Sequence, residues 1–157
     1  MTPLQNVYDA FFAKMLEDEW ANWTEDELAQ DLLEILKGAI PWFKFPRVDL
    51  TIEGDSFVGD LNNQEIQILA TYMKCEWLNR TILTWENVKP LYEERDFSQA
   101  NLIDKFIKLL EQEKRNALNL ERIYYRVVKG KPFNYSKLAG DVKWIMHLAW
   151  KRLTIIN

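Results

Sequence analysis

Hydrophobic residues recur at steps of three and four along most of the chain, which is the spacing of one face of an α-helix. The pattern is densest after Asn62. This residue has Glu65 three positions later, a capping box that satisfies the free amides at the start of a helix. The apolar positions that follow are Ile66, Ile68, Leu69, Ala70, Tyr72, Met73, Trp77 and Leu78. We expect this central helix to be largely buried.

Two helices are predicted before the central one. The first covers about residues 3–19, with Pro3 in its first turn, where a missing N–H costs little. Its apolar face comprises Leu4, Val7, Tyr8, Phe11, Phe12, Met15 and Leu16. The second begins at a capping box formed by Thr24 and Glu27 and ends at Gly38, a residue type common just after helix ends. Its inward positions are Leu28, Leu32, Ile35 and Leu36.

A β-hairpin is predicted between these helices and the central one. Apolar and polar residues alternate from Val48, Gly54 and Asp55 supply a turn, and the chain returns through Phe57 and Val58. Two isolated strands are marginal in water. We therefore expect the hairpin to pack on the helices of its own chain, and pairing with the edge of a neighbouring subunit is the alternative.

Residues 83–97 are predicted as a loop or short helix interrupted at Pro90. Asp96 or Ser98 then caps a long fourth helix that reaches about Val128. Its apolar positions follow a 3.5-residue repeat, broken only at Glu113, which is typical of a seam for another helix. That other helix is either one of the first two helices of the same chain or a helix of another subunit.

The residues after Gly130–Pro132 contain a fifth helical pattern, amphipathic from Leu138 to Leu153. The expected fold is thus mainly α: a bundle of about five helices with a long helix in the C-terminal half and one small hairpin. We expect a helical domain over residues 1–130 and a C-terminal segment over residues 131–157. The segment's basic, Trp-bearing helix is predicted to bind a partner protein; contact with lipid or packing on its own domain are the alternatives.

Composition and charge point toward interaction surfaces. The chain is 48% hydrophobic and carries seven Trp residues, so some aromatics are expected at an interface. Residues 1–62 hold 13 acidic and 4 basic side chains (−9), whereas residues 63–157 hold 11 acidic and 16 basic (+5). This polarity is compatible with a solvated monomer, but copies packed head to tail would bring opposite charges together.

The search for reactive groups is mostly negative. The single histidine, His147, has no acidic neighbour in sequence, and the five glycines are scattered rather than gathered in a phosphate-binding loop. The one cysteine, Cys75, falls within the central apolar helix and is expected to be a small buried hydrophobe. No catalytic residue, cofactor or metal is predicted, and no signal peptide or membrane-spanning segment.

Nucleic-acid binding is the main alternative from another class. Basic and aromatic residues interleave late in the chain: Arg122, Tyr124, Tyr125, Arg126, Lys129, Lys131, Phe133, Tyr135 and Lys137. Such a patch can bind phosphates without sequence preference. The chain as a whole is acidic, with a pI of about 5.1. We therefore expect no measurable duplex binding at physiological salt.

The sequence also resembles a known protein family over most of its length. Residues 62–80, followed by TWENVKPLYEERDFSQANL at 84–102, are similar to small neck, or head-tail connector, proteins of tailed bacteriophages. The similarity extends over about residues 4–141. It includes the turn at Trp23–Glu27, the segment Phe43–Pro46 and the motif KPFNYSKLAGD at 131–141.

The resemblance implies a noncatalytic virion protein that is made in the host bacterial cytoplasm. Such proteins form a ring, usually of twelve copies, between the portal protein and the next neck or tail-completion protein. DNA passes through the channel without specific binding, and no membrane is involved. A small helical nucleic-acid-binding or regulatory phage protein is the alternative.

The implied functional residues form surfaces. Connector proteins commonly dock a C-terminal segment into the portal, which makes Phe133, Tyr135, Trp144 and Trp150 the candidates for the portal contact. For the contact between subunits, the candidates are Glu25, Asp26, Arg122 and Arg126.

Overall fold

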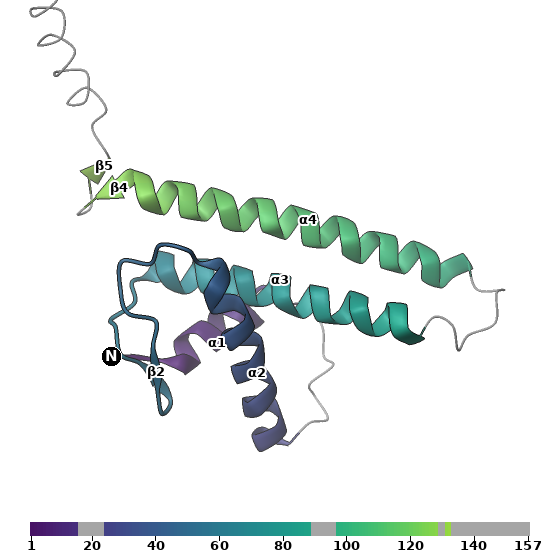
Figure 1. Ribbon diagram of the computed structural model, residues 1–157, viewed down its shortest axis with the longest axis horizontal. Helices are drawn as coiled ribbons and strands as arrows, with labels where there is room; N and C mark the ends of the chain where they lie inside the picture. Colours follow the sequence, from purple (N-terminus) through teal and green to yellow (C-terminus); the bar gives the residue numbers. More distant parts are fainter. Residues whose placement is uncertain (16–23, 89–96, 129–130, 133–157) are drawn as a thin grey trace, which may run out of the picture. The chain divides into compact units, whose positions relative to one another are not determined.

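Four α-helices make up most of the described part of the chain (Figure 1). The computed structural model describes residues 1–15, 24–88, 97–128 and 131–132. The helices are α1 (Leu4–Phe12), α2 (Glu25–Ala39), α3 (Asn63–Val88) and α4 (Phe97–Arg126). A small antiparallel sheet of three strands accompanies them. The predicted mainly α class is confirmed, and the predicted fifth helix lies outside the described residues.

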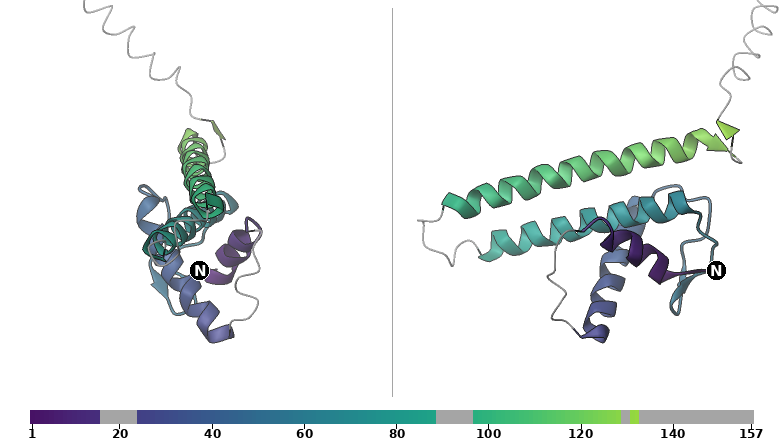
Figure 2. Two further views of the ribbon diagram at one scale, coloured as in Figure 1. Left: turned by 90° about the vertical axis from the view of Figure 1, so that its right-hand side faces the viewer. Right: turned by 180° about the vertical axis from the view of Figure 1, so that it is seen from behind.

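Helix α3 is the centre against which α1 and α2 pack, as the view from behind shows (Figure 2). Its capping box is confirmed. The Asn62 side chain accepts the Glu65 N–H at 3.0 Å, and the Glu65 carboxylate accepts the Asn62 N–H at 2.8 Å. The expected burial is confirmed for Ile68, Leu69, Ala70, Tyr72, Met73, Trp77 and Leu78, and Ile66 is half-buried.

Helix α1 buries the predicted residues Leu4, Val7, Tyr8 and Phe11. Its bounds differ from the prediction, because the helix ends at Phe12 and continues only as turns through Met15. Pro3 precedes the helix as its N-cap and does not occupy the first turn. The reason is that Thr2 and Pro3 are held in extended conformation as strand β1 (Thr2–Pro3).

Helix α2 opens on the predicted capping box, in which the Thr24 hydroxyl accepts the Glu27 N–H and the carboxylate of Glu27 accepts the Thr24 N–H. The predicted stop at Gly38 is wrong. The helix continues through Gly38 to Ala39 and into the 3₁₀ helix η2 (Ile40–Trp42). A Cβ atom on Gly38 would lie 2.9 Å from Cγ of Glu76 on α3. The glycine therefore permits a close approach of two helices.

The predicted hairpin is confirmed as β2 (Ile52–Glu53) and β3 (Ser56–Phe57), which pair in antiparallel fashion. Gly54 turns the chain with a φ of 57°, a conformation that favours glycine. On its other side β3 pairs with β1, so that Thr2 lies opposite Phe57. The sequence did not predict this third strand, which covers the free edge of β3 within the same chain.

The boundaries of the two long helices also differ from the prediction. Helix α3 runs to Val88, so residues 83–88 are helical and do not form part of a loop. Helix α4 begins at Phe97, which places Ser98 inside it and excludes Ser98 as its cap. At its other end α4 stops at Arg126, because β4 (Val127–Val128) pairs with β5 (Lys131–Pro132) as a second small hairpin.

Helix α4 lies antiparallel alongside α3, as both views and the contacts across the pair show (Figures 1 and 2). The predicted seam thus faces α3. One alternative had expected it to face one of the first two helices, but α1 and α2 pack on α3 instead. Its most buried members are Leu110, Ala117 and Tyr124. A division into compact units falls just after Tyr124, and the first unit comprises Met1–Tyr124. The boundary predicted at residue 130 stays a prediction.

Candidate interaction surfaces

Polar side chains form several of the contacts between α3 and α4. The Tyr72 hydroxyl donates a hydrogen bond of 2.7 Å to the Glu121 carboxylate, and both groups are buried. Lys74 donates to Glu113 at 2.9 Å. Glu113 is the residue that interrupts the apolar repeat, so the interruption marks an ion pair with α3. Burial alone would raise the pKa of Glu113, but hydrogen bonds from Lys74 and Asn116 lower it below its usual value.

Tyr124 joins three segments near the C-terminal end of α4. Its hydroxyl donates to Oε1 of Glu65 at 2.6 Å and accepts the Arg47 N–H at 2.8 Å. The Arg47 guanidinium donates to the Tyr124 carbonyl and lies 4.4 Å from the centre of its ring. Burial, followed by the bond to Glu65, raises the pKa of Tyr124 to about 12. The phenol is therefore a neutral donor at physiological pH.

Trp42 lies at the end of η2 and links the loop before the hairpin to the helix pair. Its ring stacks on Tyr72 with centroids 6.5 Å apart, and Nζ of Lys114 lies 5.5 Å from its centroid. The indole nevertheless stays 46% exposed. Trp42 thus packs against the ring of Tyr72, whose hydroxyl donates the buried hydrogen bond to Glu121.

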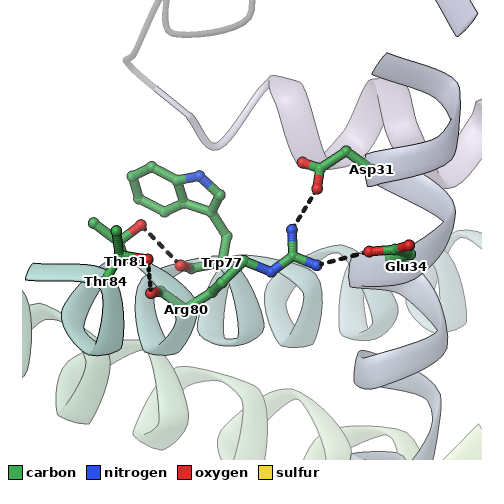
Figure 3. Close-up of polar contacts among 6 residues, drawn as sticks. All are labelled: Asp31, Glu34, Trp77, Arg80, Thr81 and Thr84. Carbon is green, nitrogen blue, oxygen red and sulfur yellow. Dashed lines mark hydrogen bonds and ion pairs between the residues drawn. The ribbon is translucent and has the colours of Figure 1, made fainter. Parts of the chain in front are cut away.

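An acidic stripe follows α2 and consists of Glu27, Gln30, Asp31 and Glu34, which line a hollow of about 380 Å³. Arg80 reaches it from α3 (Figure 3). The Arg80 guanidinium binds Asp31 and lies 3.5 Å from the Glu34 carboxylate. Asp31 is largely covered, whereas the side chain of Glu34 is 58% exposed. The stripe thus binds one guanidinium and keeps exposed carboxylates.

The outer face of α4 has the opposite character. A donor stripe runs along it at alternating steps of three and four residues, and every member is exposed: Lys105, Lys108, Gln112, Arg115, Asn119 and Arg122. Four of the six are cations. Asp104 and Glu111 are also exposed on this helix, beside the stripe. The apolar residues Ile107, Leu118 and Ile123 are exposed as well, with Leu118 at 61%.

The structure describes the four residues that were predicted for the contact between subunits. Asp26 is exposed in the first turn of α2, and Glu25 begins this helix. Arg122 and Arg126 are exposed on α4, and Arg122 donates to the Asn119 side chain at 2.9 Å. Asp26 and Arg122 form no ion pair with each other among the described side chains. The portal candidates Phe133, Tyr135, Trp144 and Trp150 lie outside those residues.

Sequence reasoning missed the roles of Arg80, Arg47 and Trp42. Each acts across a long separation in sequence, so helix periodicity carries no signal for its partner. Arg80 does follow the apolar face of the central helix as an isolated cation, and α2 carries carboxylates at helical spacing. These two facts together are the only sequence signal for the ion pair. The apolar repeat predicts Tyr124 as a seam position, but it carries no signal for the hydrogen bonds of its hydroxyl group.

Cys75 is free and buried, as predicted. Burial raises the pKa of its thiol to about 11, so the reactive thiolate is scarce at neutral pH. Among the described residues, no three histidine, cysteine or acidic side chains are grouped so as to hold a metal ion. None of the helices in the described ranges is long and apolar enough to cross a membrane.

No known protein family, curated protein or solved structure matches the chain.

Proposed function

We propose that this chain is a noncatalytic structural subunit of a tailed-phage neck. In this role it forms a ring that joins the portal to the tail and continues the DNA channel. The resemblance of residues 4–141 to head-tail connector proteins supports the proposal. The mainly helical fold agrees with the class expected for such a protein.

The observation that carries the proposal is the opposite charge of two exposed helix faces. The acidic stripe lies on α2 and the donor stripe on α4, and both belong to the unit Met1–Tyr124. A subunit with two different, complementary surfaces can associate head to tail, and a head-to-tail contact closes into a ring when its rotation permits. The buried polar groups support a structural role, since they join α3 to α4.

Portal binding is assigned to the C-terminal segment 131–157, with Phe133, Tyr135, Trp144 and Trp150 as its anchors. Large aromatic side chains supply much of the energy of protein interfaces. The test is a chain that ends after Gly130, expressed in an infection that lacks the full-length protein. We expect the shortened chain to be missing from purified particles by quantitative mass spectrometry. Incorporation at the normal copy number would overturn the portal assignment.

The whole proposal is tested by the full-length protein. We expect it in purified virions at one fixed ratio to the portal protein, and light scattering of a mixture with purified portal should show a complex larger than portal alone. Virions without the chain would refute the assignment to the neck.

The exposed cations of α4 favour a nucleic-acid-binding regulator as the second candidate. Phosphates would contact the donor stripe, and binding would weaken steeply with salt. We expect no shift of a labelled duplex at physiological salt and micromolar protein. A salt-sensitive shift would support the regulator instead.

A further inference from the structure

We infer that the donor stripe of α4 docks on the acidic stripe of α2 in a second copy of this chain. This inference rests on the proposed ring and identifies the two surfaces that would form its subunit contact. It differs from the contact expected from sequence, which used the first turn of α2 and the end of α4. The new surfaces lie further along α2 and nearer the start of α4, and they share Arg122 with that expectation.

The first argument is spacing. Arg115 and Arg122 are seven residues apart on α4, and Glu27 and Glu34 are seven residues apart on α2. Seven residues advance a helix by about 10.5 Å, close to two turns. Two helices laid side by side can therefore bring both cations to both carboxylates at once. Steps of three and four residues keep each set on one face.

The second argument is that the acidic stripe already accepts a guanidinium. Arg80 binds Asp31 and approaches Glu34 from within the chain (Figure 3). Its side chain covers the inner part of the stripe, and Glu27 and Glu34 remain exposed on the outer part. An arginine of a second copy could bind the exposed carboxylates of Glu27 and Glu34 in the same way. Within the described residues, Lys105, Lys108 and Arg115 form no ion pair that would have to be broken first.

The third argument concerns the apolar residues beside the stripe. Exposed ion pairs contribute only about 0–1 kcal/mol each, so charge alone makes a weak contact. Leu118 lies within one turn of both Arg115 and Arg122 and is exposed. An apolar side chain at this place suits a protein partner, whereas a phosphate backbone gains nothing from it.

The test exchanges the two charges. One full-length variant carries Arg115→Glu and Arg122→Glu, and the other carries Glu27→Arg and Glu34→Arg, at the two carboxylates whose spacing matches. We expect sedimentation velocity at low salt to show wild-type oligomers that dissociate at high salt. Each variant alone should sediment as a monomer because like charges meet. An equimolar mixture should regain oligomers, since both of its possible contacts join opposite charges.

Matched variants make the result specific. Arg115→Glu and Lys44→Glu change the net charge equally, and Lys44 is exposed outside both stripes. We expect only Arg115→Glu to weaken association, by at least tenfold in Kd, and Leu118→Ser to weaken it as well. Circular dichroism confirms that each variant folds.

Three outcomes would overturn the inference: a wild type monomeric at every salt concentration, a mixture that fails to reassemble, or equal effects of the two matched variants. Loss of duplex binding in Arg115→Glu, with association intact, would assign the stripe to nucleic acid. None of these outcomes decides whether purified virions contain the chain. The proposed function therefore fails or stands by its own experiment.

Discussion

Tyr124 donates a hydrogen bond to Glu65, the residue that also accepts the backbone N–H of Asn62. One buried carboxylate therefore closes the first turn of α3 and holds the end of α4. The two residues are 59 positions apart. A group shared in this way couples the stability of two helices, and this coupling can be measured.

Replacing Tyr124 by Phe removes the bond to Glu65 and leaves a buried carboxylate one donor short. We expect a loss of about 1–3 kcal/mol in the free energy of unfolding, measured with urea. The matched variant Glu65→Gln keeps an acceptor for the Asn62 N–H. In a double-mutant cycle the two changes should show a coupling of about 0.5–3 kcal/mol. Purely additive effects would mean that the bond contributes nothing.

Stability should fall in alkaline solution. Burial raises the pKa of Cys75 to about 11 and the pKa of Tyr8 to about 12, and Tyr124 is raised likewise. Above about pH 9 the unfolded chain loses these protons before the native chain does, so the native state binds more protons. The free energy of unfolding then decreases as pH rises from about 9 to 12.

Urea unfolding at pH 7.5, 9 and 10.5 under reducing conditions checks this expectation. The variant Cys75→Ala removes one of the three groups and should show a shallower decrease between pH 9 and 10.5. An equal decrease in both proteins would contradict the assignment of this part of the pH dependence to the Cys75 thiol.

Gly38 should respond to substitution in a way that depends on Glu76. Alanine in a helix interior is favoured over glycine by about 1 kcal/mol, but a Cβ here meets the Glu76 side chain at 2.9 Å. We expect Gly38→Ala to be neutral or destabilising in the wild type. In a Glu76→Ala background the same change should stabilise by about 0.5–1 kcal/mol. The same gain in both backgrounds would exclude the contact as the reason for the glycine.

Arg80 should stabilise the packing of α2 on α3. Arg80→Met leaves Asp31, which is largely covered, without its partner, and we expect a loss of about 0.5–1.5 kcal/mol. The loss should shrink at high salt because the pair is partly exposed. Lys44→Met, at an exposed position, should change the unfolding free energy by less than about 0.5 kcal/mol. Thermal melts at two salt concentrations compare the two variants.

The features that the sequence predicted are the local ones. Both capping boxes are confirmed because each needs only residues three positions apart. Strand β1 was missed because Thr2 becomes a strand only through its pairing with Phe57, far along the chain. Glu113 was recognised as a break in the apolar repeat, but its partner Lys74 depends on how α4 lies against α3. Local patterns thus gave the helices and their faces, and the contacts between elements required the tertiary structure.

The three-stranded sheet also determines the order in which parts of the chain can fold during synthesis. Strand β1 has no partner until Phe57 has left the ribosome, and Val7 and Phe11 of α1 find their packing surface only when α3 has followed. Domains generally fold as units during translation. Residues 2–12 therefore leave the ribosome as an apolar segment whose packing partners are made later, and we expect chaperones to bind it in this interval.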